Sequence, residues 1–298
     1  SLLNFGHYDE FLRYLDKYHG IAFHYISQPI QFFISNLVSN LNEVSDFGGH
    51  LMSKHSIVFL IFSLSGIYFF RLINKITQNL FFSYLSTSLY LLYPYLFGHS
   101  LFNMKDIPFL SVWLITTYYF LTIIEDIYFE KKLTYKKLIF ISFLTAYLIS
   151  IRILGILIFL QVLISLVILF NIKDIKLSVF IKNYYKKFSI SLFLLVLFVY
   201  LMNPIFWLDP YEFINSIKWM SNYFNNICTL TLGDCMNSLS LPSSYYFIWL
   251  FFKLPIIIIL GVLIFPLIEK KIFNNDLNSI YYGTFCFSTL SIILLFIL

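Results

Sequence analysis

Long apolar runs, separated by short polar breaks, recur along the whole chain of 298 residues. Many of these runs approach the length that an α-helix needs to cross a hydrocarbon core of about 30 Å. The pattern therefore predicts an all-α fold, a polytopic bundle of about eight membrane-spanning helices. We expect these spans at residues 56–70, 79–97, 107–124, 138–151, 153–170, 188–206, 245–268 and 280–298.

Three segments depart from a simple series of spans. The apolar run 138–170 would extend about 50 Å as one helix, so we divide it at Ser150-Ile151-Arg152 into two short helices whose tips meet at one face. Segments 1–55 and 207–244 are long, aromatic and mildly polar, which predicts interfacial helices and folded loops on the bilayer surface. We interpret 1–298 as a single transmembrane domain, truncated at both ends and belonging to a longer protein.

Composition supports a membrane protein. The chain is 59% hydrophobic and 12% charged, with a mean hydropathy of +0.81. Soluble domains carry about 25% charged residues, roughly twice that share. The net charge of +5 comes from Lys and Arg residues that lie mostly between the spans and form no basic stripe, so we expect no nucleic-acid partner.

Positive charge predicts the orientation of the spans. If the first span runs from outside to inside, the inner segments are 71–78, 125–137, 171–187 and 269–279, and they hold 13 Lys and Arg residues. The outer segments hold only six, although they are longer in total. An excess of Lys and Arg marks the cytoplasmic side, so the more acidic face, with all six His residues, is predicted to lie outside.

The sequence GHSLFNMKDIPF, residues 98–109, interrupts the apolar pattern at the outer face. Pro108 suits the start of the next helix. Lys105 and Asp106 are open to two interpretations: a mutual ion pair that caps the helix, or a water-accessible cavity in which Asp106 acts and Lys105 meets a phosphate.

Arg152 stands alone at an apolar hairpin tip, and here too two interpretations remain. A cation near membrane depth is costly and commonly pairs with an anion or lines a substrate path, but it can also extend to lipid headgroups. Gly155 nearby would let another backbone or a ligand approach closely.

Three other charged positions have structural alternatives. Asp209, before Pro210, either caps a surface helix or lines a site. Lys253 either extends outward from its span or contacts an anionic lipid phosphate. The pair Asp9-Glu10 lies on a predicted amphipathic helix, where a solvated face is the alternative to a site.

The cysteine and histidine patterns predict one covalent link and no metal centre. Cys228 and Cys235 flank a Gly-Asp turn between strand-like residues, and outside the cytoplasm we hypothesise a disulfide between them. No HxxxH or HExxH motif occurs, and His50 and His55 are five residues apart rather than four. Neither a G-x-S-x-G elbow nor a P-loop is present.

Several segments together resemble a family of bacterial membrane glycosyltransferases of the GT-C fold, related to dolichyl-phosphate-mannose protein mannosyltransferases and aminoarabinose transferases. The order of the segments in the chain carries the resemblance more than any one of them. They are YLDKYHGIAF, MSKHSIVFL, YPYLFGHSLFNMKDIPFLSVWLITTYYF, LISIRILGILIFL, NPIFWLDPYEFINSIKWMSNYF and LPSSYYFIWLFFKLPIIIILGVLIF.

The resemblance implies an enzyme that takes a sugar from a polyprenyl-phosphate donor at the outer face of the inner membrane. Asp106 in KDIP matches one acidic position of the family. Either Asp9-Glu10 or a motif upstream of Ser1 would supply the other. Arg152 matches a basic position, and Lys105 and Lys253 are further candidates for binding the donor phosphate. We expect His99, Asn103 and Asp209 to line the site.

The chemistry of sugar transfer suits these residues. An inverting transfer needs a carboxylate that takes the acceptor's proton and positive charge on the departing phosphate. The acceptor would be a lipid, a glycan or a protein, and a divalent cation remains an open question. A lipid-linked glycan transporter or flippase is the first alternative function, and a non-catalytic membrane scaffold is the second.

Overall fold

The computed structural model describes residues 18, 20–42, 46–207, 209–221, 228–231, 233–237, 241–242, 244–256, 258–261 and 276–297. The protein is all-α and 83% helical. Within these described residues, four helical segments are long and apolar enough to cross a membrane: Leu51–Thr77, Asp106–Tyr128, Ile153–Lys173 and Leu177–Met202. The chain is therefore a membrane protein. The predicted pair Asp9-Glu10 lies outside the described residues.

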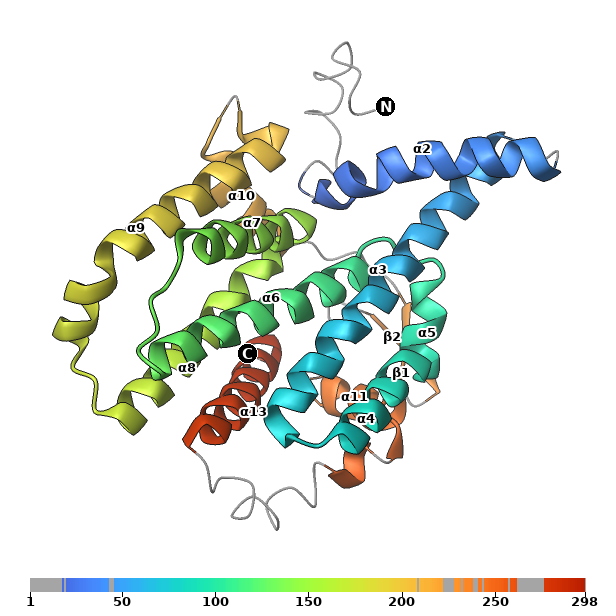
Figure 1. The fold of residues 1–298 in the computed structure, drawn as a ribbon. Helices are drawn as coiled ribbons and strands as arrows, with labels where there is room; N and C mark the ends of the chain where they lie inside the picture. The colour runs from blue at the N-terminus through green and yellow to red at the C-terminus, as the bar shows by residue number, and fades with distance from the viewer. Residues whose placement is uncertain are drawn as a thin grey trace.

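The helices and strands follow one another as labelled in Figure 1. In chain order they are α2 (Ala22–Asn42), α3 (Asp46–Thr77), α4 (Leu80–Leu92), α5 (Pro94–Ser100), α6 (Asp106–Tyr128), α7 (Tyr135–Ile151), η2 (Ile153–Leu157), α8 (Ile158–Lys173), α9 (Leu177–Met202), η3 (Pro204–Phe206), α10 (Glu212–Ser221), β1 (Cys228–Thr231), β2 (Asp234–Asn237), α11 (Tyr245–Lys253) and α13 (Asp276–Ile297).

Helix α6 lies at the centre of the bundle. It packs against α3 on one side and against α7 and α8 on the other, while α13 packs on α8 (Figure 1). Helix α9 packs mainly on α7, and α2 crosses the beginning of α3. The start of α6 meets the end of α7 at one end of this bundle, which we call the Arg152 end. The end of α6 meets the start of α7 at the other, the Glu125 end.

Among the described residues the core consists of two larger buried clusters, one toward each end of the bundle, and two smaller ones. Apolar side chains fill these clusters, and a few buried polar side chains are paired between helices. Thr117 on α6 donates a hydrogen bond to Gln161 on α8 at 3.1 Å, and the hydroxyls of Ser165 and Thr284 lie 2.9 Å apart. Such pairs hold neighbouring helices together where water is absent.

Large apolar side chains cover much of the outside of the bundle. On α9, Leu192, Phe193 and Val196 are each at least 60% exposed. Exposed apolar patches of this extent are not seen on soluble monomers, but they are expected for helices that face lipid tails.

Two predicted boundaries differ from the structure. Helix α9 begins at Leu177 and not at 188, so Lys182, Lys186 and Lys187 lie on its first turns instead of in a loop. Lys is a good helix former, and these side chains can reach water from the helix surface. The predicted span 79–97 is divided into α4 and α5 before Pro94, whose ring disfavours helical geometry at the preceding residue.

The break predicted at Arg152 is present. Helix α7 ends at Ile151, Arg152 has extended backbone geometry, and the chain re-enters a helix through η2. Gly155 is buried in η2, where an added Cβ atom would lie 2.8 Å from the backbone of Leu148 and Ile149. Glycine at this position therefore lets the turn fold back against the end of α7.

The polar segment after α10 contains a small hairpin. Strands β1 and β2 are antiparallel, and Gly233 in the turn has φ of +97°, a conformation that glycine adopts without strain. The structure links Cys228 and Cys235 by a disulfide across this hairpin.

Candidate functional site

An ion pair joins the two polar positions that interrupt the apolar pattern at the Arg152 end. A guanidinium nitrogen of Arg152 lies 2.6 Å from Oδ1 of Asp106. Asp106 begins α6 and Arg152 follows α7, so the pair connects two helix ends that are 46 residues apart in sequence. The side chains remain 56% and 32% exposed, respectively, so a ligand can reach both charges.

Asn103 fixes the second oxygen of the Asp106 carboxylate. Its side-chain oxygen accepts hydrogen bonds from the backbone N–H groups of Lys105 and Asp106, at 3.1 and 2.9 Å. The amide nitrogen must then point the other way, and it donates to Oδ2 of Asp106 at 2.9 Å. The carboxylate is thus held from both sides, by Asn103 and by Arg152.

The same amide group indicates which ring nitrogen of His99 accepts a hydrogen bond. The amide nitrogen of Asn103 lies 3.2 Å from Nδ1 of His99, and because this nitrogen can only donate, Nδ1 must be the unprotonated, accepting atom. The His99 ring also packs against Tyr95 and Phe102, with ring centroids 4.4 and 5.1 Å away. The imidazole therefore joins the polar network to a cluster of aromatic rings.

A cavity of about 350 Å³ opens beside the ion pair. The size falls within the range of ~300–1,000 Å³ that is usual for small-molecule sites. Cations and one carboxylate share the lining with aromatic and apolar side chains. The lining residues are Gly20, Phe23, His24, Phe102, Asn103, Met104, Lys105, Asp106, Ile151 and Arg152.

Gly20 brings the segment before α2 to the end of α7. An added Cβ atom would lie 2.2 Å from the carbonyl oxygens of both Ser150 and Ile151, which no side chain could tolerate. The close approach places His24, in the first turn of α2, on the wall of the cavity opposite the break at Arg152.

His24 is held in its neutral form. Burial lowers the pKa of this imidazole, and the positive charges of Lys54 and Lys105 lower it further. A neutral imidazole can accept or donate a hydrogen bond at pH 7 without adding a third full positive charge to a cavity that already contains Lys105 and Arg152.

The other predicted site residues lie apart from this cavity. The Lys253 ammonium lies 5.7 Å from the Tyr95 ring, and its backbone carbonyl accepts a hydrogen bond from Tyr93. Asp209 accepts a hydrogen bond at 2.8 Å from the backbone N–H of Tyr211, just before α10, which is the capping role considered above. Neither residue is part of the cavity lining.

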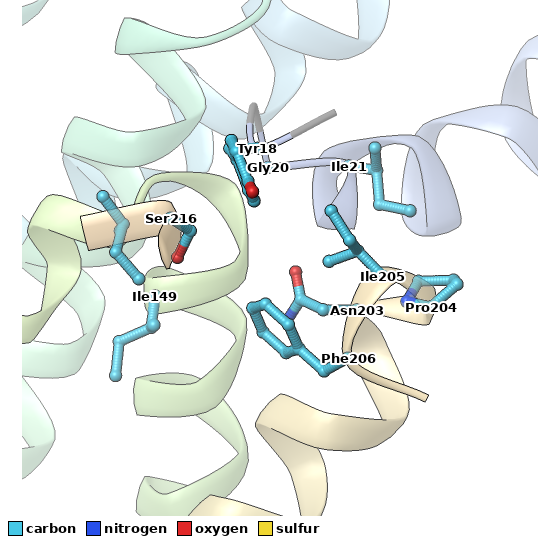
Figure 2. Close-up of a pocket in the computed structure, with 10 residues that line it drawn as sticks. Tyr18, Gly20, Ile21, Ile149, Asn203, Pro204, Ile205, Phe206 and Ser216 are labelled. Carbon is cyan, nitrogen blue, oxygen red and sulfur yellow. The ribbon is translucent and has the colours of Figure 1, made fainter. Parts of the chain in front are cut away.

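A second cavity, of about 20 Å³, lies where the N-terminal segment meets the end of α9 (Figure 2). It has room for a single water molecule. Asn203 lines it and donates a hydrogen bond at 2.7 Å to Ser150, two residues before Arg152. This small cavity belongs to the packing that supports the break, and it is too small for a substrate.

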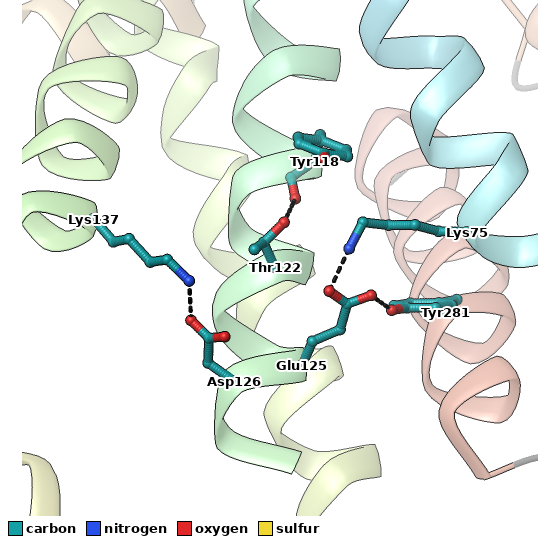
Figure 3. A network of polar contacts seen from close by, with 7 residues as sticks. All are labelled: Lys75, Tyr118, Thr122, Glu125, Asp126, Lys137 and Tyr281. Atoms are coloured by element: carbon teal, nitrogen blue, oxygen red, sulfur yellow. Dashed lines mark hydrogen bonds and ion pairs between the residues drawn. The ribbon is translucent and has the colours of Figure 1, made fainter. Parts of the chain in front are cut away.

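A second charged network occupies the Glu125 end (Figure 3). The Glu125 carboxylate accepts hydrogen bonds from the Lys75 ammonium and the Tyr281 hydroxyl, which links α6 to α3 and α13. The neighbouring Asp126 pairs with Lys137 on the first turn of α7. Because both carboxylates are already paired and lie at helix ends, this network is a structural clamp between helices.

The described residues contain no group of three or more His, Cys, Asp and Glu side chains arranged to hold a metal ion. Asp106 is the one carboxylate among the cavity residues, and its two oxygens already contact Arg152 and Asn103. The described donors at the cavity therefore form no divalent-cation site by themselves, and we derive no chemical step through one.

Comparison with known proteins gives no match: no family model, no curated protein and no solved structure is similar to this chain. The residues and geometry of the cavity are therefore what indicate a function.

Sequence reasoning selected Asp106, Arg152, Lys105 and Asn103, and the structure brings these four together around one cavity. It assigned no role to Gly20 or His24, which complete the wall. A glycine two residues before an amphipathic helix gives only a weak signal of close packing, and nothing local indicates which helix it would contact.

Proposed function

We propose that the protein is a glycosyltransferase that moves a hexose or pentose from a polyprenyl-phosphate donor to a lipid, glycan or protein acceptor. The observation that carries the proposal is the exposed Asp106–Arg152 pair on the wall of a substrate-sized cavity. A carboxylate and a guanidinium in contact supply the two charges that this transfer needs. The resemblance of the surrounding segments to GT-C enzymes supports the same assignment.

In the proposed reaction, Asp106 acts as general base. It takes the proton from the acceptor hydroxyl as the acceptor oxygen forms a bond to the anomeric carbon of the sugar. The bond between that carbon and the phosphate oxygen breaks, and its electron pair remains on the phosphate. Arg152 and Lys105 stabilise the negative charge that develops there, as charged donors do at departing phosphoryl groups.

The resting ion pair gives Arg152 a switching role. A donor phosphate competes with Asp106 for the guanidinium, and Arg–phosphate contacts are charge-assisted and often bidentate. Loss of the Arg152 contact leaves Asp106 held by Asn103 alone. The carboxylate then becomes a better proton acceptor at the moment when the donor is bound.

We further propose that the chain makes eight crossings of the bacterial inner membrane and that the Arg152 end faces the periplasm. The four long apolar helices, together with α4–α5, α7, the α11 region and α13, would supply these crossings. The support is the charge distribution. Of the thirteen Lys and Arg residues from 71 to 187, eleven are exposed or partly exposed at or near the Glu125 end, and only Lys105 and Arg152 lie at the Arg152 end.

Replacement of Asp106 by Asn tests the proposal directly. Removal of a general base lowers the rate by about 10²- to 10⁴-fold, while Asn preserves the shape of the side chain. We expect Asp106→Asn to abolish sugar transfer from a panel of polyprenyl-phosphate sugars in proteoliposomes, with membrane insertion unchanged. Asp209→Asn is the matched control, because Asp209 caps a surface helix outside the cavity lining.

Two results would contradict the proposal. Wild-type transfer by Asp106→Asn would remove this carboxylate from the mechanism. Facilitated movement of lipid-linked sugar across the bilayer, without any new glycosidic bond, would favour the flippase. If the protein is a non-catalytic scaffold, Asp106→Asn should change neither sugar transfer nor the movement of lipid-linked sugar across the bilayer.

A further inference from the structure

An elongated apolar groove of about 420 Å³ lies between α8 and α9, closed on its inner side by α6 and α7. Its lining residues on α9 extend from Tyr185 to Leu195, which corresponds to ~15 Å along the helix axis. The groove is distinct from the cavity at Arg152, because the two share no lining residue.

The polar groups of the groove are a few hydroxyls, of which those of Tyr185 and Ser189 belong to exposed residues and that of Thr145 is buried. The hydroxyls of Ser142 on α7 and Ser191 on α9 lie 2.7 Å apart and hydrogen-bond to each other. The remaining wall consists mainly of Ile, Leu, Val and Phe side chains. Such a wall offers little to water or to a polar ligand, but it suits a hydrocarbon chain.

The groove lies between part of α9 and the neighbouring α8. Among the described elements α9 packs mainly on α7, and only 6% of the apolar window of this helix is buried. Val162 on α8 and Leu192 on α9 face the same groove from opposite sides. Nearer the Glu125 end the two helices touch directly, because the rings of Phe170 on α8 and Phe180 on α9 lie 4.8 Å apart. A chain lying between Val162 and Leu192 would extend this contact along α9.

Positive charge surrounds the groove at its Glu125 end. Tyr185 lines the groove there, and the Lys186 ammonium lies 5.9 Å from the Tyr185 ring. Lys187 follows on the same helix, and Lys136 is exposed on the first turn of the neighbouring α7. A phosphate at this position would meet several ammonium groups, while the attached acyl chain could enter the groove.

We propose that this groove binds one acyl chain of an anionic phospholipid from the leaflet at the Glu125 end, and that the lysines hold its phosphate. The groove itself is independent of the proposed transferase activity, but the choice of a phospholipid over a donor chain rests on that proposed function. The polyprenyl chain of a donor is the competing occupant. The lysines favour the phospholipid, because a donor phosphate would bind at Arg152, at the opposite end of the bundle.

The test uses native mass spectrometry of the full chain, purified in detergent and supplied with phosphatidylglycerol, phosphatidylcholine or polyprenyl phosphate. We expect one retained phosphatidylglycerol per chain and weaker retention of phosphatidylcholine. Val162→Trp fills the groove and should abolish this retention. The neighbouring Leu163 is 59% exposed and outside the groove, so Leu163→Trp should retain the lipid as the wild type does.

A second pair of variants tests the charge independently of groove packing. Lys186→Gln should weaken phosphatidylglycerol binding about fivefold, the effect expected for one basic side chain near an anionic headgroup. Arg71→Gln is the control, because Arg71 also lies over a tyrosine ring, that of Tyr68 at 5.6 Å, but on α3 and away from the groove.

Three outcomes would overturn the inference. Equal retention by Val162→Trp and Leu163→Trp would show that the lipid does not occupy the groove. Equal weakening by Lys186→Gln and Arg71→Gln would show a diffuse effect of charge. Displacement of phosphatidylglycerol by polyprenyl phosphate, sensitive to Val162→Trp, would assign the groove to the polyprenyl chain.

Discussion

Replacement of Glu125 by Gln should destabilise the helix bundle far more than the equivalent change at the adjacent Asp126. Glu125 accepts from Lys75 and Tyr281, and the Lys75 and Glu125 side chains are only 22% and 20% exposed. Gln keeps an oxygen that can accept from the Tyr281 hydroxyl. The variant therefore loses chiefly the contact with the Lys75 ammonium, a charge-assisted hydrogen bond worth about 2 kcal/mol.

The pair formed by Asp126 and Lys137 provides an internal comparison. The Asp126 side chain is only 10% exposed, but the Lys137 side chain is 42% exposed, so the ammonium can be solvated when its partner is removed. Partly exposed pairs of this kind contribute about 0.2–1 kcal/mol. The structure therefore predicts a larger coupling energy for Lys75–Glu125 than for Lys137–Asp126, by about 1–2 kcal/mol.

The assay is a pair of double-mutant cycles, built from Glu125→Gln with Lys75→Gln and from Asp126→Asn with Lys137→Gln. The free energy of unfolding is measured by titration of the protein in mild detergent with a denaturing detergent, followed by circular dichroism. The cycle isolates the pairwise energy from the effect of each single change. Equal coupling energies for the two pairs would refute the reasoning from burial and screening.

Three further predictions follow from the Arg152 end. Gly20→Ala should lower the free energy of unfolding by about 1–3 kcal/mol, because the added Cβ would overlap the carbonyl oxygens that end α7. An unchanged midpoint of chemical denaturation would contradict the close contact between Gly20 and the end of α7. The folded-state pKa of His24 is lowered below its unfolded value of about 6.5, so the stability that depends on neutral His24 is complete above pH 6.5 and is lost as the pH falls further. His24→Gln should therefore make the free energy of unfolding depend less steeply on pH in this acidic range. An unchanged slope would contradict the lowered pKa. In cells, a membrane-impermeant maleimide should label Phe102→Cys from outside and Lys132→Cys only after permeabilisation; the reverse pattern would invert the proposed topology.

The apolar pattern predicted the helical class and the break at Arg152, because both depend on local hydrophobicity and on an isolated charge. It placed the start of α9 eleven residues too late, since the lysines at 182, 186 and 187 resemble a loop although they extend outward from a helix. Eight spans remain a prediction, and in the part of the chain that the structure describes four helices meet the length and hydropathy expected of a span.

The features that could not be predicted from the sequence depend on contacts between residues that are far apart in the chain. The sequence singled out Asp106 and Arg152 separately, but their contact depends on how α6 packs against α7. The role of Gly20 depends on the carbonyls of residues 150 and 151, more than 100 positions away. Glu125 fell in a predicted loop, and its clamp with Tyr281 requires α13 to return to the same end of the bundle.

The affinity for a polyprenyl phosphate tests the central claim most directly, because every donor sugar would leave this same product. Arg152→Ala should weaken binding of the product about tenfold or more, since it removes a charge-assisted contact with the phosphate. Asp106→Asn should instead tighten binding, because it frees Arg152 from its resting ion pair and removes a negative charge from the cavity. We therefore expect titration calorimetry to show a lower affinity for polyprenyl phosphate in Arg152→Ala and a higher affinity in Asp106→Asn. Unchanged affinity in both, or equal weakening in both, would show that the pair only holds α6 against α7.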